Sequence, residues 1–600
     1  MNQRGFRVFW VAVLVLGLAV FSCAQTNQPR KLTILHTNDT HSAMVPFETG
    51  FIPAVGSEPK PSSGVGAGLW DVWHFPFNQD YAGIARMATL IKKLRAADKN
   101  VLALNAGDVF VGSFEFNKYL GYPELRIMEN LYDAMELGNH EFDLGVDALA
   151  GVLSGQIAGD RPVNLPILCA NVDFSGTSSS LQFLKNTVKP SIIQTVGGVK
   201  VGIFGLVTQE PQNYSDAVNA MFPYPYDDPD QTKTLWAYAA KIARGLKNPD
   251  DPINGQCDVV ICVSHLGTYV DVNVLAAKVP YIDVIIGGHS HDAYAQPYVL
   301  DSPSGGKVII VQAGQFGWYL GELKLNVDMN VHPVAVTLDK WVLHRVDGRI
   351  KEDPQVRTIV NRVRAGVVSD LRFGPVYSQH IALALRDVLK SWPANSPNRD
   401  TPLGNLVTDA YRNRLTKAGF QVDCALDVLG YLGADIWAGK VVGNNILRSV
   451  PYGYDQVSGL DFKLVVVPLY GQVLIGGLEY AADNVTLITT DLAVQASGLT
   501  YKYNSNNDPG SRVDPNSVKV NGESVYPDNL GKPYFVAMSD QVFGFLNALT
   551  KDAGHPNGQL VSLPTDLNEY TIVRDYMKSL KFVHYKSEGR IKDTAGATVK

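Results

Sequence analysis

The stretch Gly138-Asn139-His140-Glu141-Phe142-Asp143 places an amide, an imidazole and two carboxylates close together in the chain. The Asn139 amide oxygen can bind a metal ion, and His140 beside it can face a substrate. Asp143, three residues further on, can orient that imidazole through a hydrogen bond. The alternative interpretation is a helix N-terminus whose polar residues act as local caps.

Other short polar segments each follow an apolar run, and they are Asp39-Thr40-His41, Gly107-Asp108, Ser264-His265 and His289-Ser290-His291. Alternate residues of an extended chain project to one side, so Asp39 and His41 can reach one cation. Gly107 permits the tight turn that points Asp108 into a crevice at a strand end. Taken singly, a Gly-Asp pair is ordinarily a turn and a buried His is ordinarily structural. The ordered set of carboxylate, amide and imidazole indicates a two-metal hydrolase.

Strand-like and helical segments alternate from residue 31 to about residue 345, which predicts a layered α/β domain. The strand-like runs are rich in Val, Ile and Leu and cover residues 31–37, 101–105, 200–206, 259–263, 284–286 and 308–313. Near-continuous apolar strands of this kind are expected in sheets that are covered on both faces. Residues 83–97 have helical apolar spacing. A second helical stripe, which predicts a helix connecting two domains, consists of Val356, Ile359, Val360, Val363 and Val367.

Length, charge and cysteine content narrow the class of protein. The 600 residues exceed what one hydrophobic core usually supports, so two or more domains are expected. A formal net charge of -6 without basic runs argues against binding to a nucleic-acid polymer. Cys257 and Cys262 flank one predicted strand and are too far apart to bridge easily, so we expect no disulfide scaffold.

The first 22 residues have the layout of an export signal. Arg4 and Arg7 precede an uncharged apolar run over residues 8–21. Val20-Phe21-Ser22-Cys23 resembles a bacterial lipobox, in which the Cys becomes the lipid-bearing first residue, although Phe departs from the strict pattern. The alternative is cleavage nearby without a lipid. We therefore expect an exported protein, periplasmic or at the cell surface, attached to a membrane through a lipidated Cys23. Removal of residues 1–22, which contain two arginines and no acidic residue, changes the formal charge from -6 to -8.

Taken in order, the polar segments resemble the motifs of the calcineurin-type metallophosphoesterases. The framing segments at residues 35–41, 83–86 and 170–174 narrow this resemblance to the exported bacterial 5′-nucleotidase family. The resemblance implies an α/β fold, a four-layer metallophosphoesterase β-sandwich flanked by helices, followed by a smaller α+β substrate-binding domain. The expected boundaries are 1–22 for the signal peptide, 30–345 for the metallophosphoesterase domain, 346–372 for the connecting helix and 373–600 for the 5′-nucleotidase C-terminal domain.

The resemblance also implies two divalent metal ions, with zinc, manganese and cobalt left open. One ion would be held by Asp39, His41, Asp108 and His291, and the other by Asp108, Asn139, His265 and His289. Asp108 would bridge them. Two dications exceed the charge of two aspartates and a bridging hydroxide, which suits an anionic phosphoryl group. His140 would stabilise the transferring group or protonate the leaving oxygen, and Asp143 would fix its tautomer.

The second half of the chain keeps several family motifs and changes others. The resemblance places Asn405 on a helix beside the substrate phosphate and implies that Tyr452 and Phe543 stack on the base. Phe543 and Phe545 are equally explained as core residues. The family motif Asn-Gly-Gly-Gly-Ile-Arg is replaced by Val428-Leu429-Gly430-Tyr431-Leu432-Gly433, so the matched arginine is absent. Arg399 or Arg412 could substitute from elsewhere.

The leading hypothesis is an exported dimetal phosphohydrolase that releases phosphate from nucleoside 5′-monophosphates or related nucleotides. The expected partner is therefore a small-molecule nucleotide or phosphoester, and the oligomeric state stays open. A second hypothesis keeps the dimetal core but changes the ester to a cyclic nucleotide, a nucleotide sugar or the substrate of a sulfate-releasing thiohydrolase. A third is a non-catalytic surface-binding lipoprotein, which would have no need to keep both His140 and Asp143.

Overall fold

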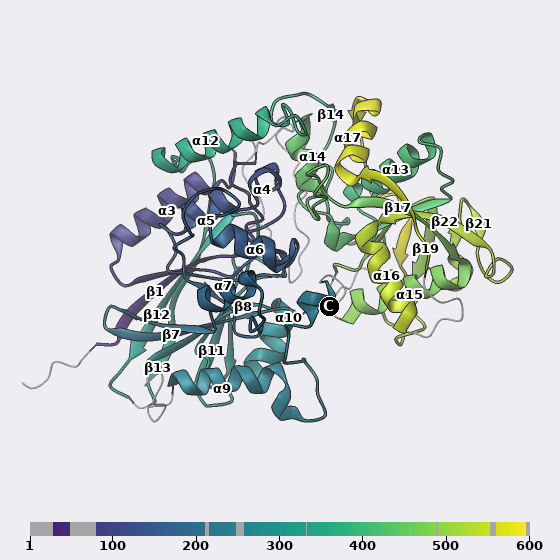
Figure 1. Cartoon of the computed structure of the whole chain (residues 1–600). Helices are drawn as coiled ribbons and strands as arrows, with labels where there is room; N and C mark the ends of the chain where they lie inside the picture. Colours follow the sequence, from purple (N-terminus) through teal and green to yellow (C-terminus); the bar gives the residue numbers. More distant parts are fainter. Residues whose placement is uncertain are drawn as a thin grey trace, which may run out of the picture.

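The computed structural model describes residues 28–47, 80–209, 215–247, 257–331, 333–487, 490–552 and 560–595. The chain forms a larger N-terminal unit and a smaller C-terminal unit, each with its own sheets and helices (Figure 1). The expected signal peptide and Cys23 lie outside the described residues. Within the described ranges, no helix is long and apolar enough to cross a membrane.

Two β-sheets form the centre of the N-terminal unit. The seven-stranded sheet has the order β13-β12-β1-β2-β3-β4-β5, and the six-stranded sheet has the order β10-β11-β9-β8-β7-β6. All six strands predicted from apolar runs are present. The strands are β1 Arg30–Thr37, β2 Val101–Asn105, β3 Ala134–Glu136, β4 Ile167–Leu168, β5 Val188–Lys189, β6 Ser191–Val196, β7 Val199–Val207, β8 Val259–His265, β9 Val284–Gly287, β10 Tyr298–Asp301, β11 Lys307–Val311, β12 Tyr319–Asp328 and β13 Ala335–Arg345.

The sheets pack against each other and carry helices on their outer faces. Ile34 of β1 and Ile203 of β7 belong to one core between the sheets, while Leu35 of β1 belongs to the core beneath helix α3 (Ile84–Ala97). Helix α9 (Leu235–Lys247) covers the other sheet. The order helix, sheet, sheet, helix confirms the predicted four-layer sandwich. Further helices are α4 Phe114–Tyr119, α5 Tyr122–Met128, α6 Gly145–Leu153, α7 Ser179–Thr187, α8 Asp216–Asn219, α10 Thr268–Val270 and α11 Ala276–Lys278.

The predicted connecting helix is α12 (Pro354–Ser369). It begins after Asp353, whose carboxylate accepts hydrogen bonds from the first-turn backbone N–H groups of the helix. Val356, Val360, Val363 and Val367 are buried, but the prediction was wrong for Ile359, which is 39% exposed. The buried stripe follows a spacing of four, three and four residues, so Ile359 lies at its edge.

A mixed five-stranded sheet with the order β18-β15-β22-β17-β23 forms the centre of the C-terminal unit. Helices α13 (Pro402–Lys417) and α17 (Glu569–Leu580) cover one face, and α15 (Gly471–Leu487) and α16 (Asp540–Asp552) cover the other. Its strands are β15 Cys424–Val428, β17 Lys463–Tyr470, β18 Val494–Ser497, β22 Pro533–Ser539 and β23 Leu563–Asn568. Two small sheets flank it, with β14 Ala382–Ala384, β16 Gly439–Val441, β24 Phe582–Val583, β19 Leu499–Tyr503, β20 Lys519–Val520, β21 Glu523–Ser524 and β25 Ile591–Asp593.

Arg448 of α14 (Gly443–Ser449) ties the two units together. Its guanidinium donates to the carbonyl oxygens of Val45 and Pro46 and lies 3.7 Å from the ring centroid of Phe47. The side chain is 2% exposed, so these contacts replace its hydration. The C-terminal unit is therefore held against the segment that follows Asp39 and His41.

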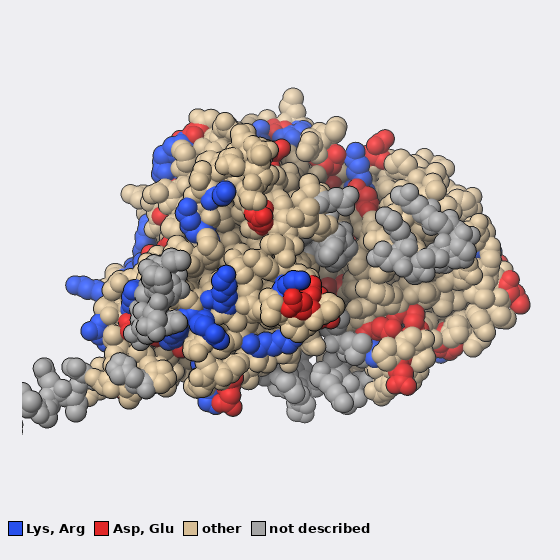
Figure 2. All heavy atoms as spheres, turned by 60° about the horizontal axis from the view of Figure 1, so that its bottom comes forward, with Lys and Arg blue, Asp and Glu red and all other residues tan. Residues whose placement is uncertain are grey.

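Acidic and basic side chains mix on the surface, and the described cysteines are buried. Figure 2 shows blue and red side chains interspersed on one face, with most of the blue over the larger unit. Cys169, Cys257, Cys262 and Cys424 are buried free thiols, which confirms, for the described residues, the expectation of no disulfide scaffold.

Candidate dimetal active site

The seven predicted metal ligands lie at the carboxyl ends of five strands. Asp39 and His41 follow β1, Asp108 follows β2 and Asn139 follows β3 in one sheet. His265 ends β8, and His289 and His291 follow β9, in the other sheet. The packed sheets therefore bring residues more than 200 positions apart in sequence to one edge of the sandwich.

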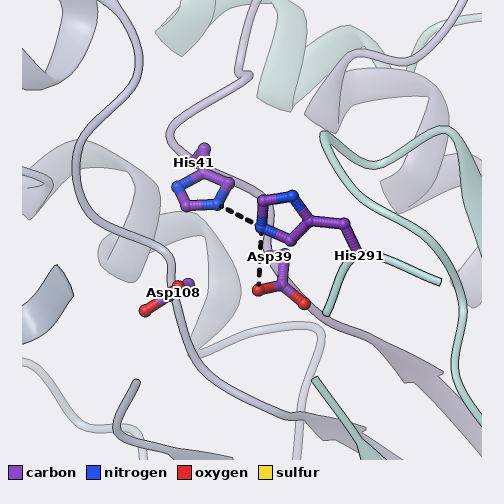
Figure 3. Close-up of side chains that lie close together, drawn as sticks. All are labelled: Asp39, His41, Asp108 and His291. Carbon is purple, nitrogen blue, oxygen red and sulfur yellow. Dashed lines mark hydrogen bonds and ion pairs between the residues drawn. The ribbon is translucent and has the colours of Figure 1, made fainter. Parts of the chain in front are cut away.

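One group of donor atoms comes from Asp39, His41, Asp108 and His291, whose ligand atoms all lie within 4.8 Å of one another. Figure 3 shows their side chains pointing into the same space. The Nε2 atom of His291 is 3.1 Å from Nε2 of His41 and 3.4 Å from Oδ1 of Asp39. These four residues are all the members of the first predicted metal-binding set.

The second group shares Asp108 with the first and adds His265 and His289. Nε2 of His265 lies 3.0 Å from Oδ2 of Asp108 and 3.1 Å from Oδ1 of Asn139. Nδ1 of His289 lies 3.1 Å from the same Asn139 oxygen. Asp108 therefore stands between two donor sets, as a bridging ligand must.

Backbone contacts fix the tautomers of two of these histidines. The Nδ1–H of His265 donates to the carbonyl oxygen of Ala106 at 2.5 Å, and that of His41 faces the carbonyl oxygen of Phe110 at 3.3 Å. Each contact leaves Nε2 free to bind a cation.

The surroundings shift the pKa values of two of these histidines in opposite directions. Burial alone would lower the pKa of His265, but the neighbouring carboxylate of Asp108 raises it to about 10. Burial, together with the nearby His291, lowers the pKa of His41 to about 3, so this ring is in the neutral form that binds metals. The donor types, their spacing and their charge all fit two divalent cations.

The backbone of the site adopts conformations that non-glycine residues rarely occupy. Asp39, His41, Asp108, His289 and His291 all have positive φ, between 45° and 72°. Such strain persists only where the surrounding structure enforces it, and it clusters at functional sites. Sequence pattern gives no signal for this feature.

Two glycines bring the Asp108 loop against the loop of Gly138. Gly107 has a φ of 87°, and a Cβ atom there would lie 2.6 Å from the backbone nitrogen of Gly138. A Cβ atom at Gly138 would overlap the Asp108 carboxylate. Glycine at both positions is therefore required for the close approach of the two loops.

Glu141 is a functional residue that the sequence reasoning missed. Its buried carboxylate accepts hydrogen bonds from the backbone N–H groups of Asp108 (3.0 Å), Val109 (2.8 Å), Phe110 (3.0 Å) and Gly138 (2.6 Å). It thereby holds the loop of Asp108 in place from a position outside both donor groups. The sequence feature that could have identified it is its position directly after Asn139 and His140.

His140 and Asp143 lie on the rim of the metal site. Nδ1 of His140 is 2.8 Å from Oδ2 of Asp143, and the two side chains are 19% and 23% exposed. The backbone N–H of His140 donates to Oδ1 of Asp108 at 3.0 Å. The predicted pairing of these two side chains is therefore present next to Asp108.

A cleft of about 710 Å³ opens between the two units, beside the donor groups. Asp108, Asn139 and His140 line it from the N-terminal unit, and Tyr452 lines it from the C-terminal unit. The ring of Tyr452 stacks on that of His140, with centroids 5.2 Å apart and planes inclined by 16°. Tyr452 thus lines the cleft and stacks on the His140 ring, while its stacking on a base stays a prediction.

The cationic side chains that line the cleft are Lys390 and Lys463, and no arginine of the described residues lines it. Arg399 is buried and pairs with Asp593 at 3.4 Å, while Arg412 donates to Asn521. Neither arginine takes the place of the absent motif arginine.

Two predicted substrate-binding residues lie elsewhere. Asn405 is fully buried and donates to Asp400 (2.8 Å) and to the carbonyl oxygen of Lys586 (3.0 Å), so it supports the start of α13. Phe543 is partly buried against the hydrophobic core and does not line the cleft, whereas Phe545 does. Residues two positions apart on a helix face opposite sides, and the sequence did not fix where α16 begins.

Two packed sheets with helices outside, and paired donor sets that share one aspartate, define a dinuclear metallophosphoesterase. Residues 32–293 match the family model for calcineurin-like phosphoesterases, and residues 387–546 match that for the 5′-nucleotidase C-terminal domain. The chain belongs to the 5′-nucleotidase family.

Relatives along most of the chain support this assignment. Protein 5NUC of Lutzomyia longipalpis is 30% identical over 86% of this chain and 84% of its own length. The 5′-nucleotidase of Bos taurus is 28% identical over 100% of this chain and 96% of its own length. The crystal structure of a 5′-nucleotidase precursor from Thermus thermophilus has a TM-score of 0.72 and 28% identity, covering 94% of this chain and 99% of that one.

Proposed function

We propose that this protein hydrolyses nucleoside 5′-monophosphates or related nucleotides to nucleoside and phosphate. The observation that carries the proposal is the place of Asp108, which stands between two complete donor sets and beside His140 at the wall of a large cleft. The named activity of the relatives supports the same reaction class.

The geometry supports a role for each of these residues in the proposal. Asp39, His41, Asp108 and His291 would hold one cation, and Asp108, Asn139, His265 and His289 would hold the other. When bound, two divalent cations neutralise phosphoryl oxygens and lower the pKa of an attacking water.

His140 is the proton-handling residue in this proposal. Asp143 accepts from its Nδ1–H, which orients the ring and favours the protonated form. The other nitrogen can then donate to the transferring phosphoryl group or to the leaving oxygen.

Lysines would contribute the remaining positive charge toward the phosphate. Burial lowers the pKa of Lys390, while the nearby carboxylates of Asp491 and Asp435 favour its charged form. Lysine is a point charge and lacks the bidentate fork of arginine. The cleft therefore relies on the metal site more than an arginine-lined cleft would.

Hydrolysis of AMP, a nucleotide sugar, a cyclic nucleotide and an aryl phosphate, each with Mn²⁺ and with the products separated by chromatography, tests the function. The proposal expects AMP to be turned over well and the cyclic nucleotide poorly. Preferred turnover of the cyclic nucleotide would favour a phosphodiesterase instead, and inactivity on all four compounds would remove the phosphohydrolase proposal.

The organisation of the chain is part of the proposal. We take residues 30–345 as the metal-binding domain, 346–372 as the connecting helix and 373–600 as the substrate-binding domain, with residues 1–22 as an export signal and Cys23 as the lipid-bearing residue. Expression of the full chain with a Cys23→Ser control tests the last point. The mass of the mature N-terminal peptide should show acyl chains in the wild type only, and an unmodified N-terminus in the wild type would contradict it.

A further inference from the structure

An apolar slot of about 70 Å³ lies in the C-terminal unit, between helices α15 and α16 and the central sheet. Its walls include Val473 and Leu474 of α15, Val542 and Leu546 of α16, and Leu426 of β15. Apolar side chains form almost the whole lining, so water in the slot would find few hydrogen-bond partners. An apolar group that displaced this water would gain binding free energy.

The slot adjoins the active-site cleft. Val428, Leu492 and Phe545 line both spaces, so the slot lies directly behind the wall that these side chains give the cleft. Phe545 lies at this junction, with its ring 5.8 Å from the ring of Tyr480. Val428 therefore adds an apolar surface to a cleft that no arginine of the described residues lines.

The absence of an arginine from the cleft and the presence of the apolar slot both change which part of the substrate supplies binding free energy. Without an arginine in the cleft, less of the binding free energy comes from the phosphate. A group that buries apolar surface in the slot can supply binding free energy from a part of the substrate remote from phosphorus.

We infer that the slot receives an aliphatic arm of the leaving alcohol, so that phosphomonoesters whose alcohol carries an apolar extension are substrates in addition to the nucleotides. The inference rests on the proposed phosphohydrolase function, because the slot acts only on what the metal site cleaves. The reaction is unchanged, with the phosphorus to leaving-oxygen bond broken and the new bond made to the oxygen of water.

A series of n-alkyl phosphates from methyl to dodecyl, each below its micelle concentration, tests the inference. The value of kcat/KM should be flat for short chains, rise about fourfold for each methylene that enters the slot, and then level off. The chain length at which kcat/KM begins to rise gives the distance from the phosphorus atom to the slot.

A matched pair of glycines on α15 provides the control. A Cβ atom at Gly477 would lie 3.4 Å from Cδ1 of Leu546, so Gly477→Leu places its side chain toward the slot. A Cβ atom at the neighbouring Gly476 would meet nothing within 4 Å, so Gly476→Leu adds the same side chain outside the slot. Gly477→Leu should abolish the rise with chain length and leave methyl phosphate turnover unchanged, whereas Gly476→Leu should behave as wild type.

Leu546→Trp narrows the slot from α16 and serves as a second variant if Gly477→Leu does not fold. A flat profile in the wild type, or a rise that survives in a folded slot variant, would overturn the inference while leaving phosphohydrolase activity intact. Failure of the wild type to hydrolyse methyl phosphate, AMP and an aryl phosphate would instead remove the proposed function.

Discussion

A single carboxylate holds the loop that carries Asp108. The Glu141 carboxylate accepts hydrogen bonds from four backbone N–H groups. A glutamine amide has only one accepting oxygen, and its NH₂ group would face N–H groups that are also donors. We therefore expect Glu141→Gln to weaken divalent-metal binding by about 10- to 100-fold. Calorimetric titration of the metal-free protein with Mn²⁺ measures this change.

The fold of Glu141→Gln should survive, because the residue serves one loop. An unchanged far-ultraviolet circular dichroism spectrum is the control. Wild-type metal affinity in this variant would show that the four hydrogen bonds do not position the bridging ligand.

His140 donates to the phosphoryl group or to the leaving oxygen in the proposed reaction but is outside both donor groups. His140→Ala should lower kcat by about 10²- to 10⁴-fold while both metal ions remain bound. Metal content by mass spectrometry and turnover of AMP are measured on the same sample. Loss of metal together with activity would assign His140 a ligand or structural role instead.

Asp143→Asn is the companion variant. The amide can keep a contact with the His140 ring but cannot stabilise its protonated form as a carboxylate does. We expect a smaller loss of kcat than in His140→Ala, with KM little changed. A larger loss than in His140→Ala would contradict the assignment of Asp143 as a positioning residue.

At the residue scale, the sequence predicted the candidate metal ligands better than it predicted the side chains and backbone conformations that hold them in place. The seven donor residues follow apolar strands and stand in a recognisable order, so their identity could be read from the chain. The support from Glu141 and the positive φ of Asp39 depend on loop geometry, which no local pattern encodes. Phe543 was misplaced because the helical phase depends on where α16 begins.

Three elements of the C-terminal unit meet at a buried group of acids. The Tyr411 hydroxyl of α13 lies 2.9 Å from the Asp427 carboxylate of β15 and 2.5 Å from that of Glu569 on α17. One hydroxyl proton serves one acceptor, so the other contact requires a protonated carboxyl. Burial raises the pKa of Asp427 to about 7 and that of Glu569 well above its usual value.

This arrangement makes stability depend on pH. The folded pKa of Asp427 is above its ordinary value of 3.8, so between about pH 4 and pH 7 the folded protein keeps a proton that the unfolded chain releases. The free energy of unfolding should fall with rising pH, by about 1.4 kcal/mol per pH unit. Asp427→Asn cannot ionise, so its Tm relative to wild type should increase from pH 5 to pH 8.

Asp566→Asn is the control for loss of one carboxylate, because this side chain is 91% exposed. Its Tm should follow that of wild type across the same range. A constant difference between Asp427→Asn and wild type from pH 5 to pH 8 would show that Asp427 is ionised throughout.

At the scale of elements, the apolar runs predicted all six strands named from the sequence. They could not show which strands share a sheet, because a strand buried on both faces looks the same whether a helix or a second sheet covers it. The division into two sheets depends on tertiary packing. It was therefore predicted from the family resemblance and not from the apolar runs.

At the scale of the whole molecule, the cleft exists because both units contribute its walls. Arg448 fastens them through two carbonyl oxygens and the Phe47 ring. Arg448→Met would leave those carbonyl groups unpaired and should cost about 1–3 kcal/mol. We expect a lower Tm, a larger radius of gyration in small-angle scattering and a higher KM for AMP.

Arg412→Met removes an arginine that bonds Asn521 within the C-terminal unit and serves as the control. It should leave the radius of gyration and KM at wild-type values. If Arg448→Met also keeps both values, the contacts of Arg448 do not determine how the units are held together.

The most direct test of the two-metal account is a titration of metal-free protein with Mn²⁺, in which bound metal and phosphate release from AMP are followed together. The account predicts that activity saturates at two ions per chain, and that Asp108→Asn, which lacks the shared carboxylate, binds less metal and loses turnover. Full activity in the metal-free protein, or saturation at one ion per chain, would contradict it.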